Sequence, residues 1–161
     1  YYNIIRKKTA TLLAACTFSG SVSGGASEED ALKMKELGNY IGMAFQIKDD
    51  LFDFNMDNKT GKPAGNDIRE QKYTLPLIHT FKTCSTTEKK HLYKLLKQFE
   101  KNKNNIHEIN KIISEHQGFE YTQHVMMSFI QKAKDILTIM PQNEANESLS
   151  LLIDYIVERQ K

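Results

Sequence analysis

The sequence predicts an all-α fold. Apolar and small residues recur at three- and four-residue steps over several long segments, which is the spacing of one helix face. No segment alternates apolar and polar residues over the length of a strand between turn signals. The chain has only three prolines, and seven of its eight glycines lie before residue 66. We therefore expect a helical scaffold whose unusual backbone conformations are concentrated in the first 80 residues.

Residues 1–18 form the first predicted helix, and the turn signals Ser19-Gly20 and Gly24-Gly25 end it. Its face of apolar and small residues consists of Ile4, Ile5, Thr9, Leu12, Leu13, Ala15 and Cys16. A second helix begins after Ser27, because a serine hydroxyl satisfies free N–H groups and the acidic residues that follow favour the positive end of the helix dipole. Its apolar pattern continues to about Phe54.

Residues 55–72 lose the periodicity, and we expect a long loop of the kind that is usually functional in a compact domain. Thr74 is the predicted cap of the next helix, whose first turn tolerates Pro76. Thr86, Thr87 and Glu88 begin another helix. Three more are expected over residues 106–115, 121–140 and 144–159, separated at Gly118 and Pro141.

Length, charge and cysteine content exclude several classes of protein. A chain of 161 residues can bury about two-thirds of its surface, which supports one domain and leaves little room for two. The net charge is only +2, and basic residues alternate with acidic ones, so nucleic acid is not an expected partner. Cys16 and Cys84 have no disulfide or metal-ligand spacing. Since no membrane span or leader is recognised, we expect a cytoplasmic, reducing location.

The most informative segment carries three carboxylates. Asp49, Asp50 and Asp53 are spaced so that a helix would project them from one face, with Gln46 a turn earlier on the same side. Like charges placed together repel unless a cation lies among them, and hard oxygen ligands suit Mg²⁺ that is also held by substrate phosphates. The alternative is a solvated acidic face. The apolar, glycine-containing character of the surrounding helix favours the metal site.

Two lysines are candidates for binding an anion. Lys62 lies between Gly61 and Pro63 in the long loop, and its ammonium is a compact charge that pairs well with phosphate. Lys8 precedes Thr9 where polar residues of the first helix give way to small and apolar ones, so that its cationic group could point into a cavity. An ordinary surface lysine is the alternative for each.

Five segments together resemble a known family. In order they are Lys8-Thr9, Phe45-Gln46, Asp49-Asp50-x-x-Asp53, Gly61-Lys62 and Lys72-Tyr73-Thr74-Leu75-Pro76. Their order and intervals, with the flanking residues 40–46 and 65–68, resemble the C-terminal half of the trans-isoprenyl diphosphate synthases. The resemblance extends from Tyr1 to the end of the chain. Residues 73–79 and the C-terminal helices look most like the long-chain type, similar to octaprenyl diphosphate synthase.

The resemblance implies a helical bundle around a central cavity for diphosphate and metal. There, three Mg²⁺ ions, one of them held by this part, bind an allylic diphosphate, and isopentenyl diphosphate attacks the cation that forms when the C–O bond ionises. It assigns residues as follows: Asp49, Asp50 and Asp53 to the metal, Lys8, Lys62 and secondarily Lys72 to the allylic diphosphate, Thr9 and Gln46 to the developing cation, and Phe45 to the cavity wall. Arg159 and Lys161 are candidates for closing over the second substrate.

The sequence departs from the family pattern in one large respect. The first aspartate-rich motif and the Gly-Lys-x-x-Arg segment of active members are absent, and they would precede Tyr1. We therefore expect residues 1–161 to be the C-terminal part of a single polyprenyl synthetase domain and to be inactive alone. The complete protein would be a prenyltransferase of isoprenoid biosynthesis and a homodimer. The alternatives are a class I terpene cyclase and a non-catalytic subunit or remnant of a two-component synthase.

Overall fold

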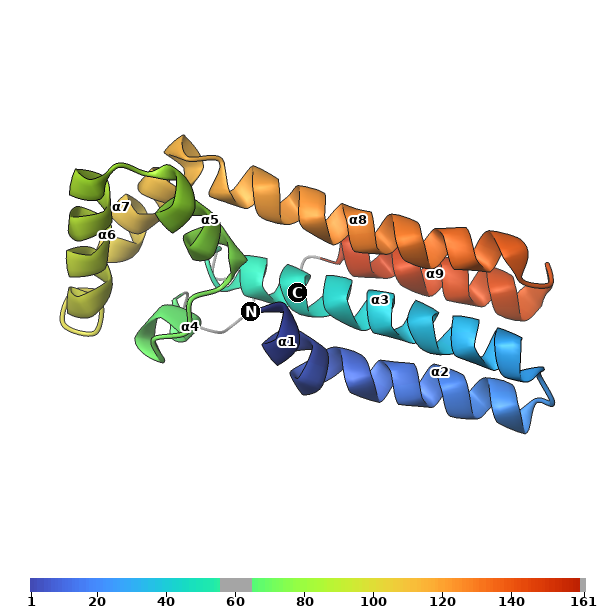
Figure 1. Cartoon of the computed structure of the whole chain (residues 1–161). Helices are drawn as coiled ribbons and strands as arrows, with labels where there is room; N and C mark the ends of the chain where they lie inside the picture. The colour runs from blue at the N-terminus through green and yellow to red at the C-terminus, as the bar shows by residue number, and fades with distance from the viewer. Residues whose placement is uncertain (56–64, 160–161) are drawn as a thin grey trace. The chain divides into compact units, whose positions relative to one another are not determined.

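The computed structural model describes residues 1–55 and 65–159. Over these residues the regular structure is entirely helical, which confirms the all-α prediction (Figure 1). The elements are α1 (Tyr2–Ile5), the π-helical turn η1 (Arg6–Ala10), α2 (Thr11–Ser23), α3 (Glu28–Phe52), α4 (Asn66–Arg69), α5 (Leu75–Thr83), α6 (Thr86–Gln98), α7 (Asn105–Glu115), α8 (Gly118–Ile139) and α9 (Glu144–Glu158). Among the helices described, none combines the length and the apolar character of a membrane span.

The first helical run is longer than predicted. It passes through Ser19-Gly20 and ends at Ser23, where the N–H of Gly24 still bonds to the carbonyl of Gly20 at 3.0 Å. A glycine costs a helix about 1 kcal/mol, which weakens the helix without ending it. The run ends where Gly25 takes a left-handed φ of 79°. The predicted turn at Gly24-Gly25 is therefore confirmed, and the predicted stop at Ser19-Gly20 is wrong.

Helix α3 begins as predicted and ends early. The amide of Asp30 donates to Oγ of Ser27 at 3.1 Å, which is the expected N-cap bond. The last helical residue is Phe52, and the N–H of Phe54 bonds to the carbonyl of Leu51 in a tighter turn. Asp53 therefore lies one residue beyond the helix.

Other boundaries agree with prediction only in part. A short helix, α4, lies in the predicted loop. Thr74 is the N-cap of α5 as expected, but its side chain makes no cap hydrogen bond; Pro76 removes one of the two amides that a capping side chain bonds. Gly118 is the first residue of α8, and Gln117, with a φ of 55°, makes the turn before it.

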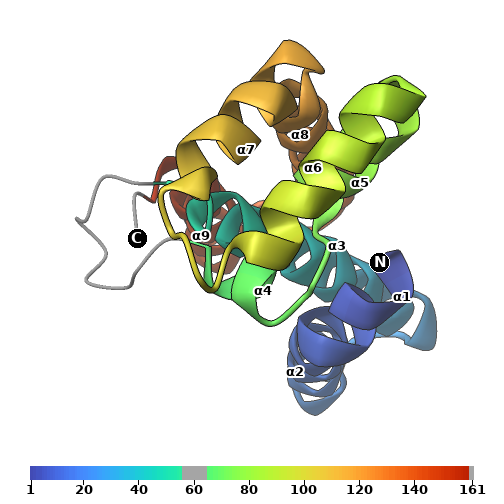
Figure 2. The same ribbon diagram turned by 90° about the vertical axis from the view of Figure 1, so that its left-hand side faces the viewer.

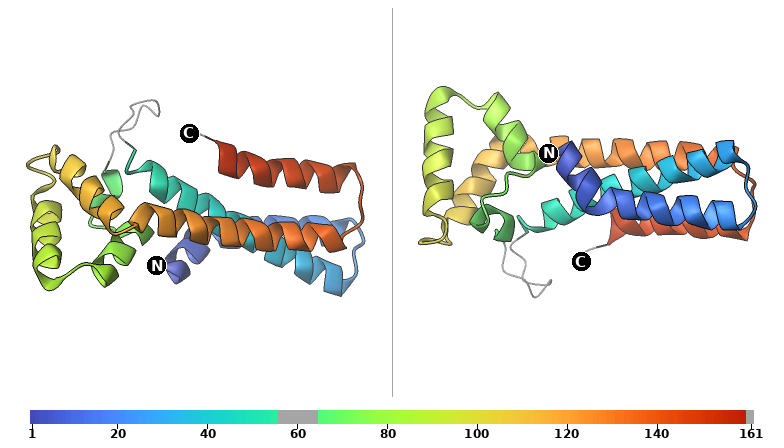
Figure 3. Two further views of the ribbon diagram at one scale, coloured as in Figure 1. Left: turned by 90° about the horizontal axis from the view of Figure 1, so that it is seen from above. Right: turned by 60° about the horizontal axis from the view of Figure 1, so that its bottom comes forward.

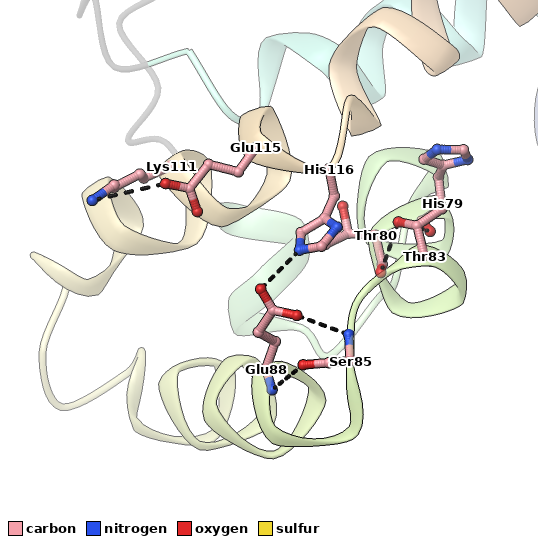
Figure 4. A network of polar contacts seen from close by, with 8 residues as sticks. All are labelled: His79, Thr80, Thr83, Ser85, Glu88, Lys111, Glu115 and His116. Carbon is pink, nitrogen blue, oxygen red and sulfur yellow. Dashed lines mark hydrogen bonds and ion pairs between the residues drawn. The ribbon is translucent and has the colours of Figure 1, made fainter.

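Helix α6 begins at Thr86 as predicted, and its N-cap is the preceding residue, Ser85 (Figure 4). The amide of Glu88 donates to Ser85 Oγ at 3.3 Å, and the amide of Ser85 donates to Glu88 Oε2 at 2.8 Å. The other oxygen of Glu88 lies 3.2 Å from Nε2 of His116. The hydrogen bonds from Ser85, followed by the one from His116, lower the pKa of Glu88 to about 2.

The chain divides into two compact units, each with its own core. The first unit comprises Tyr1–Lys48 and Val125–Gln160. In it α2, α9 and the unit's parts of α3 and α8 run alongside one another (Figures 1 and 3). Its core includes Ile5, Leu37, Ile41, Met43, Ile47, Met126, Ile130 and Ile153.

The second unit comprises Asp49–His124. Figure 2 shows α4, α5, α6 and α7 within it. The apolar faces of its helices meet in a core that includes Phe54, Ile68, Leu77, Leu92, Leu96, Phe99, Ile109 and Ile113. The periodic apolar residues of the sequence supply both cores.

Candidate active site

In the first unit, a polar contact joins η1 to α3. The hydroxyl of Thr9 donates to Oε1 of Gln46 at 2.6 Å. Gln46 is buried, with 6% of its surface exposed, and Thr9 is half-buried. The two residues are 37 positions apart in the sequence, and the structure brings this predicted pair together.

Glycines on α3 allow this contact. A Cβ built on Gly42 would lie 2.4 Å from Cα of Ala10, and one on Gly38 would lie 2.6 Å from the carbonyl oxygen of Leu13. Real Cβ atoms do not approach other atoms so closely, so only glycine permits the backbones of these helices to touch. Gly42 lies one turn before Gln46. The close approach at Ala10 therefore places the neighbouring Thr9 within hydrogen-bond distance of Gln46.

Lys8 is exposed on the same π-helical turn, directly before Thr9. A π-helical turn contains an extra residue, which changes the direction of the side chains on either side of it, and such turns are frequent at functional sites. Sequence periodicity did not predict this turn, because three- and four-residue steps occur on both sides of it. The position of Lys8 leaves its ammonium accessible to an anionic ligand.

Phe45 is half-buried and contacts the guanidinium of Arg159. The guanidinium of Arg159 lies 3.9 Å from the centre of the Phe45 ring and donates to the Phe45 carbonyl at 3.0 Å. Nζ of Lys48 donates to the carbonyl of Val157 at 2.8 Å. Burial, with the nearby charge of Arg159, lowers the pKa of Lys48. These contacts attach the end of α9 to α3 in the first unit. Lys161 lies outside the described residues.

The three aspartates belong to the second unit and differ in their surroundings. Asp49 is half-buried and Asp50 is buried, with 4% exposed. Asp53 is half-buried, and both oxygens of its carboxylate accept backbone hydrogen bonds, from Asn66 to Oδ1 and from Asp67 to Oδ2, each at 2.9 Å. Burial raises the pKa of Asp53, and the bonds from these amides oppose that rise.

The predicted three-carboxylate group does not converge. Among residues 1–55 and 65–159, no three histidine, cysteine or acidic side chains are gathered so that they could hold a metal ion. The N–H of Asp53 still bonds to the carbonyl of Asp49 at 3.3 Å, but both of its carboxylate oxygens are engaged by the amides of residues 66 and 67. Sequence reasoning missed this pairing, although Gly65-Asn66-Asp67 is the type of segment that begins a short helix.

Asp49 and Asp50 still fit a single Mg²⁺. They are adjacent carboxylates at the C-terminal end of α3, where the helix dipole favours a cation. Mg²⁺ is commonly bound by one or two carboxylates together with substrate phosphates, and both residues carry that type of ligand.

Lys72 follows α4 and is exposed. Its ammonium forms an ion pair with Glu70. The hydrogen bond that Lys72 donates to Glu70, with the charge of Glu70, raises the pKa of Lys72, and the charges of Asp67 and Asp50 add to the rise. Glu70 is therefore the main partner of the Lys72 ammonium, and Asp50 makes the smallest contribution. The other predicted phosphate ligand, Lys62, lies outside the described residues.

Comparison with known proteins shows relatives of one kind. A family model described as polyprenyl synthetase matches residues 1–114. A short chain isoprenyl diphosphate synthase of Methanothermobacter thermautotrophicus is 32% identical over 161 residues, which are 99% of this chain and 49% of the relative. An octaprenyl diphosphate synthase of Haemophilus influenzae is 29% identical over 160 residues, or 99% and 48%. Component 2 of the heptaprenyl diphosphate synthase of Bacillus subtilis is 31% identical over 160 residues, or 99% and 45%.

A solved structure agrees with these sequences. A polyprenyl synthase of Caulobacter crescentus, complexed with calcium and isoprenyl diphosphate, has a TM-score of 0.87 and 30% identity, and the match covers 100% of this chain and 49% of that one. The chain thus spans about half the length of the relatives it matches. With most of its length matched by the family model, the chain belongs to the polyprenyl synthetase family.

Proposed function

We propose that residues 1–161 are the C-terminal part of a single polyprenyl synthetase domain and that the complete protein is a trans-polyprenyl diphosphate synthase. The reaction ionises an allylic diphosphate, and the double bond of isopentenyl diphosphate attacks the resulting cation. A carbon–carbon bond forms, diphosphate leaves, and loss of a proton restores a double bond. The observation that carries the proposal is the bond between Thr9 and Gln46, on the helix that also bears Asp49 and Asp50.

Thr9 and Gln46 would stabilise the developing cation. The hydroxyl of Thr9 donates its one hydrogen to Gln46, and a hydroxyl has two acceptor lone pairs. Oxygen dipoles that are fixed before the reaction stabilise charge without reorganising during it. Gln46 is buried and Thr9 is half-buried, so water has limited access to the contact.

Lys8, Lys62 and Lys72 would bind the allylic diphosphate as negative charge develops on it. Charge-assisted hydrogen bonds from an ammonium to phosphate oxygens are stronger than neutral ones. Asp49 and Asp50 would hold one Mg²⁺, which when bound supplies further neutralisation of the leaving diphosphate. Phe45 would contribute to the apolar wall that excludes water. The two other Mg²⁺ ions and the isopentenyl diphosphate site are assigned to the remainder of the domain.

The test is prenyl transfer by the complete protein, with labelled isopentenyl diphosphate and farnesyl diphosphate in the presence of Mg²⁺. We expect elongated products from the complete protein and none from residues 1–161 alone. Omission of isopentenyl diphosphate should stop product formation, whereas a terpene cyclase would still consume the allylic substrate. Activity of the 161-residue chain without a partner would contradict the assignment to an incomplete site.

A second candidate follows from the similarity to component 2 of a heptaprenyl synthase. In that case the chain would belong to a two-component synthase, and activity would require a different polypeptide. The complete protein would then be inactive when purified alone and active after the second component is added. The predicted homodimer and cytoplasmic location stay predictions, and size measurement of the complete protein in solution tests the first of them.

A further inference from the structure

We propose that Asp53 is a positioning residue that fixes α4 and Lys72 relative to the acidic end of α3, rather than a ligand of the metal. The proposal rests on the proposed function for the metal held by Asp49 and Asp50. The hydrogen bonds of Asp53 are seen in the structure itself and do not depend on the proposed function.

Three hydrogen bonds join Asp53 to the start of α4. Its backbone carbonyl accepts from the amide of Gly65 at 2.7 Å. Its two carboxylate oxygens accept from the amides of Asn66 and Asp67 at 2.9 Å each. The first N–H groups of a helix have no partner within the helix, and a carboxylate is a strong acceptor for them. Asp53 thus fills the role of a cap although it is 13 residues from Asn66.

Neighbouring contacts hold both sides of this junction. Nδ2 of Asn110, on α7, donates to the carbonyl of Phe54 at 2.9 Å. On the other side, Gly65 has a φ of 79°, and a Cβ there would lie 2.3 Å from the ring of Phe99. Residues 54 and 65 are therefore both anchored in the core of the second unit, and Asp53 joins backbone segments that have little freedom to move apart.

The junction determines where Lys72 lies. The amide of Lys72 bonds to the carbonyl of Asp67 at 2.8 Å, and that of Gln71 bonds to the carbonyl of Ile68 at 3.0 Å. Ile68 is buried, which fixes the middle of this segment. A short hydrogen-bonded path therefore runs from Asp53 through Asp67 to Lys72. Lys72 in turn experiences the charge of Asp50. Loss of the Asp53 carboxylate should loosen the start of α4 and with it the bond from Lys72 to Asp67, while Ile68 stays buried and Asp49 and Asp50 stay in place.

The experiment uses the isotope-labelled 161-residue chain and its Asp53→Asn, Asp50→Asn and Asp135→Asn variants. Asp135 is an exposed aspartate of the first unit, so Asp135→Asn controls for loss of one negative charge. Amide hydrogen exchange is measured at Asn66, Asp67 and Lys72. Mn²⁺ affinity and the paramagnetic broadening that bound Mn²⁺ causes at the same amides are measured by NMR.

We expect Asp53→Asn to lower exchange protection at Asn66 or Asp67 by about tenfold or more, because an amide side chain keeps one acceptor oxygen of two. Its Mn²⁺ affinity should stay within about threefold of wild type, while broadening at Lys72 falls. Asp50→Asn should weaken Mn²⁺ binding at least tenfold and leave the protection of Asn66 and Asp67 unchanged. Broadening of the Lys72 amide signal depends on its distance from bound Mn²⁺. When the metal site is equally occupied in both proteins, a loss of stability that does not move Lys72 would leave this broadening unchanged.

A tenfold loss of Mn²⁺ affinity in Asp53→Asn, with the amides of Asn66 and Asp67 still protected, would overturn the proposal and show that Asp53 is a ligand of the metal. If Asp53→Asn does not fold, the wild-type chain gives the decision. Adding Mg²⁺ should then leave the protection of Asn66 and Asp67 unchanged or increased, and a decrease would mean that the carboxylate leaves the amides for the metal. Failure of wild type to bind Mn²⁺ would instead overturn the metal role of Asp49 and Asp50.

Discussion

Gly42→Ala should destabilise the protein, because the added methyl group meets a backbone atom. The Cβ would lie 2.4 Å from Cα of Ala10 and 2.9 Å from its Cβ. Carbon atoms in contact prefer separations of about 3.5–4.0 Å, so η1 and α3 would have to separate by about 1 Å. Neither atom of Ala10 belongs to a flexible side chain. The strain therefore has to be relieved by moving helices.

Two opposing contributions determine the size of the effect. Overpacking a well-packed core costs about 1–3 kcal/mol, and a backbone contact places Gly42→Ala at the upper end. Alanine is favoured over glycine in a helix by about 1 kcal/mol. We expect a net loss of about 2 kcal/mol in the free energy of unfolding, measured by urea denaturation followed by circular dichroism.

Gly20→Ala is the matched control. A Cβ at Gly20 would meet nothing within 4 Å, so the same substitution gains helix propensity without a clash. We expect Gly20→Ala to stabilise the chain by up to about 1 kcal/mol. If Gly42→Ala were as stable as Gly20→Ala, the close approach of η1 and α3 would be refuted, and with it the reason given for the contact between Thr9 and Gln46.

Three further predictions concern the cation contact, the loop end and the cap of α6. Thr9→Val in the complete enzyme should lower kcat about a hundredfold with little change in KM, because it removes a fixed dipole next to Gln46; a kcat within twofold of wild type would count against that role. Gly65→Ala combines a φ of 79° with a clash, and backbone strain of this kind costs about 1–3 kcal/mol. We therefore expect the free energy of unfolding to fall by about 2 kcal/mol or more, and an unchanged unfolding midpoint in urea would contradict this. The pKa of Glu88 is lowered to about 2, so its cap should stabilise the fold fully above about pH 4.5 and lose that contribution as pH falls toward 2. The free energy of unfolding of Glu88→Gln should fall less than that of wild type as the pH is lowered across this range, and an equal fall would exclude Glu88 as a source of the pH dependence. Ser85→Ala should lower the free energy of unfolding by about 1 kcal/mol at pH 7.

The sequence alone determined the helical elements and the identity of the candidate site residues. Helix periodicity is a local property, because residues three and four apart share a face whatever the rest of the chain does. That is why α3 and α7 were predicted to begin at or within one residue of where they do. The cap by Ser27 also depends only on residues within one turn, and its bond to Asp30 is present.

Tertiary structure decided what those residues contact. The bond from Thr9 to Gln46 depends on two glycines that let distant helices touch, and the place of Asp53 depends on amides 13 and 14 residues away. The amides that Asp53 accepts from belong to the first turn of α4, which a helix leaves without internal partners, so a distant side chain caps the start of that helix. Periodicity predicts three aspartates on one face, whereas the amides of residues 66 and 67 engage the carboxylate of Asp53. A local pattern therefore specifies a helix, whereas the hydrogen-bond partners of its last turn are supplied by the fold.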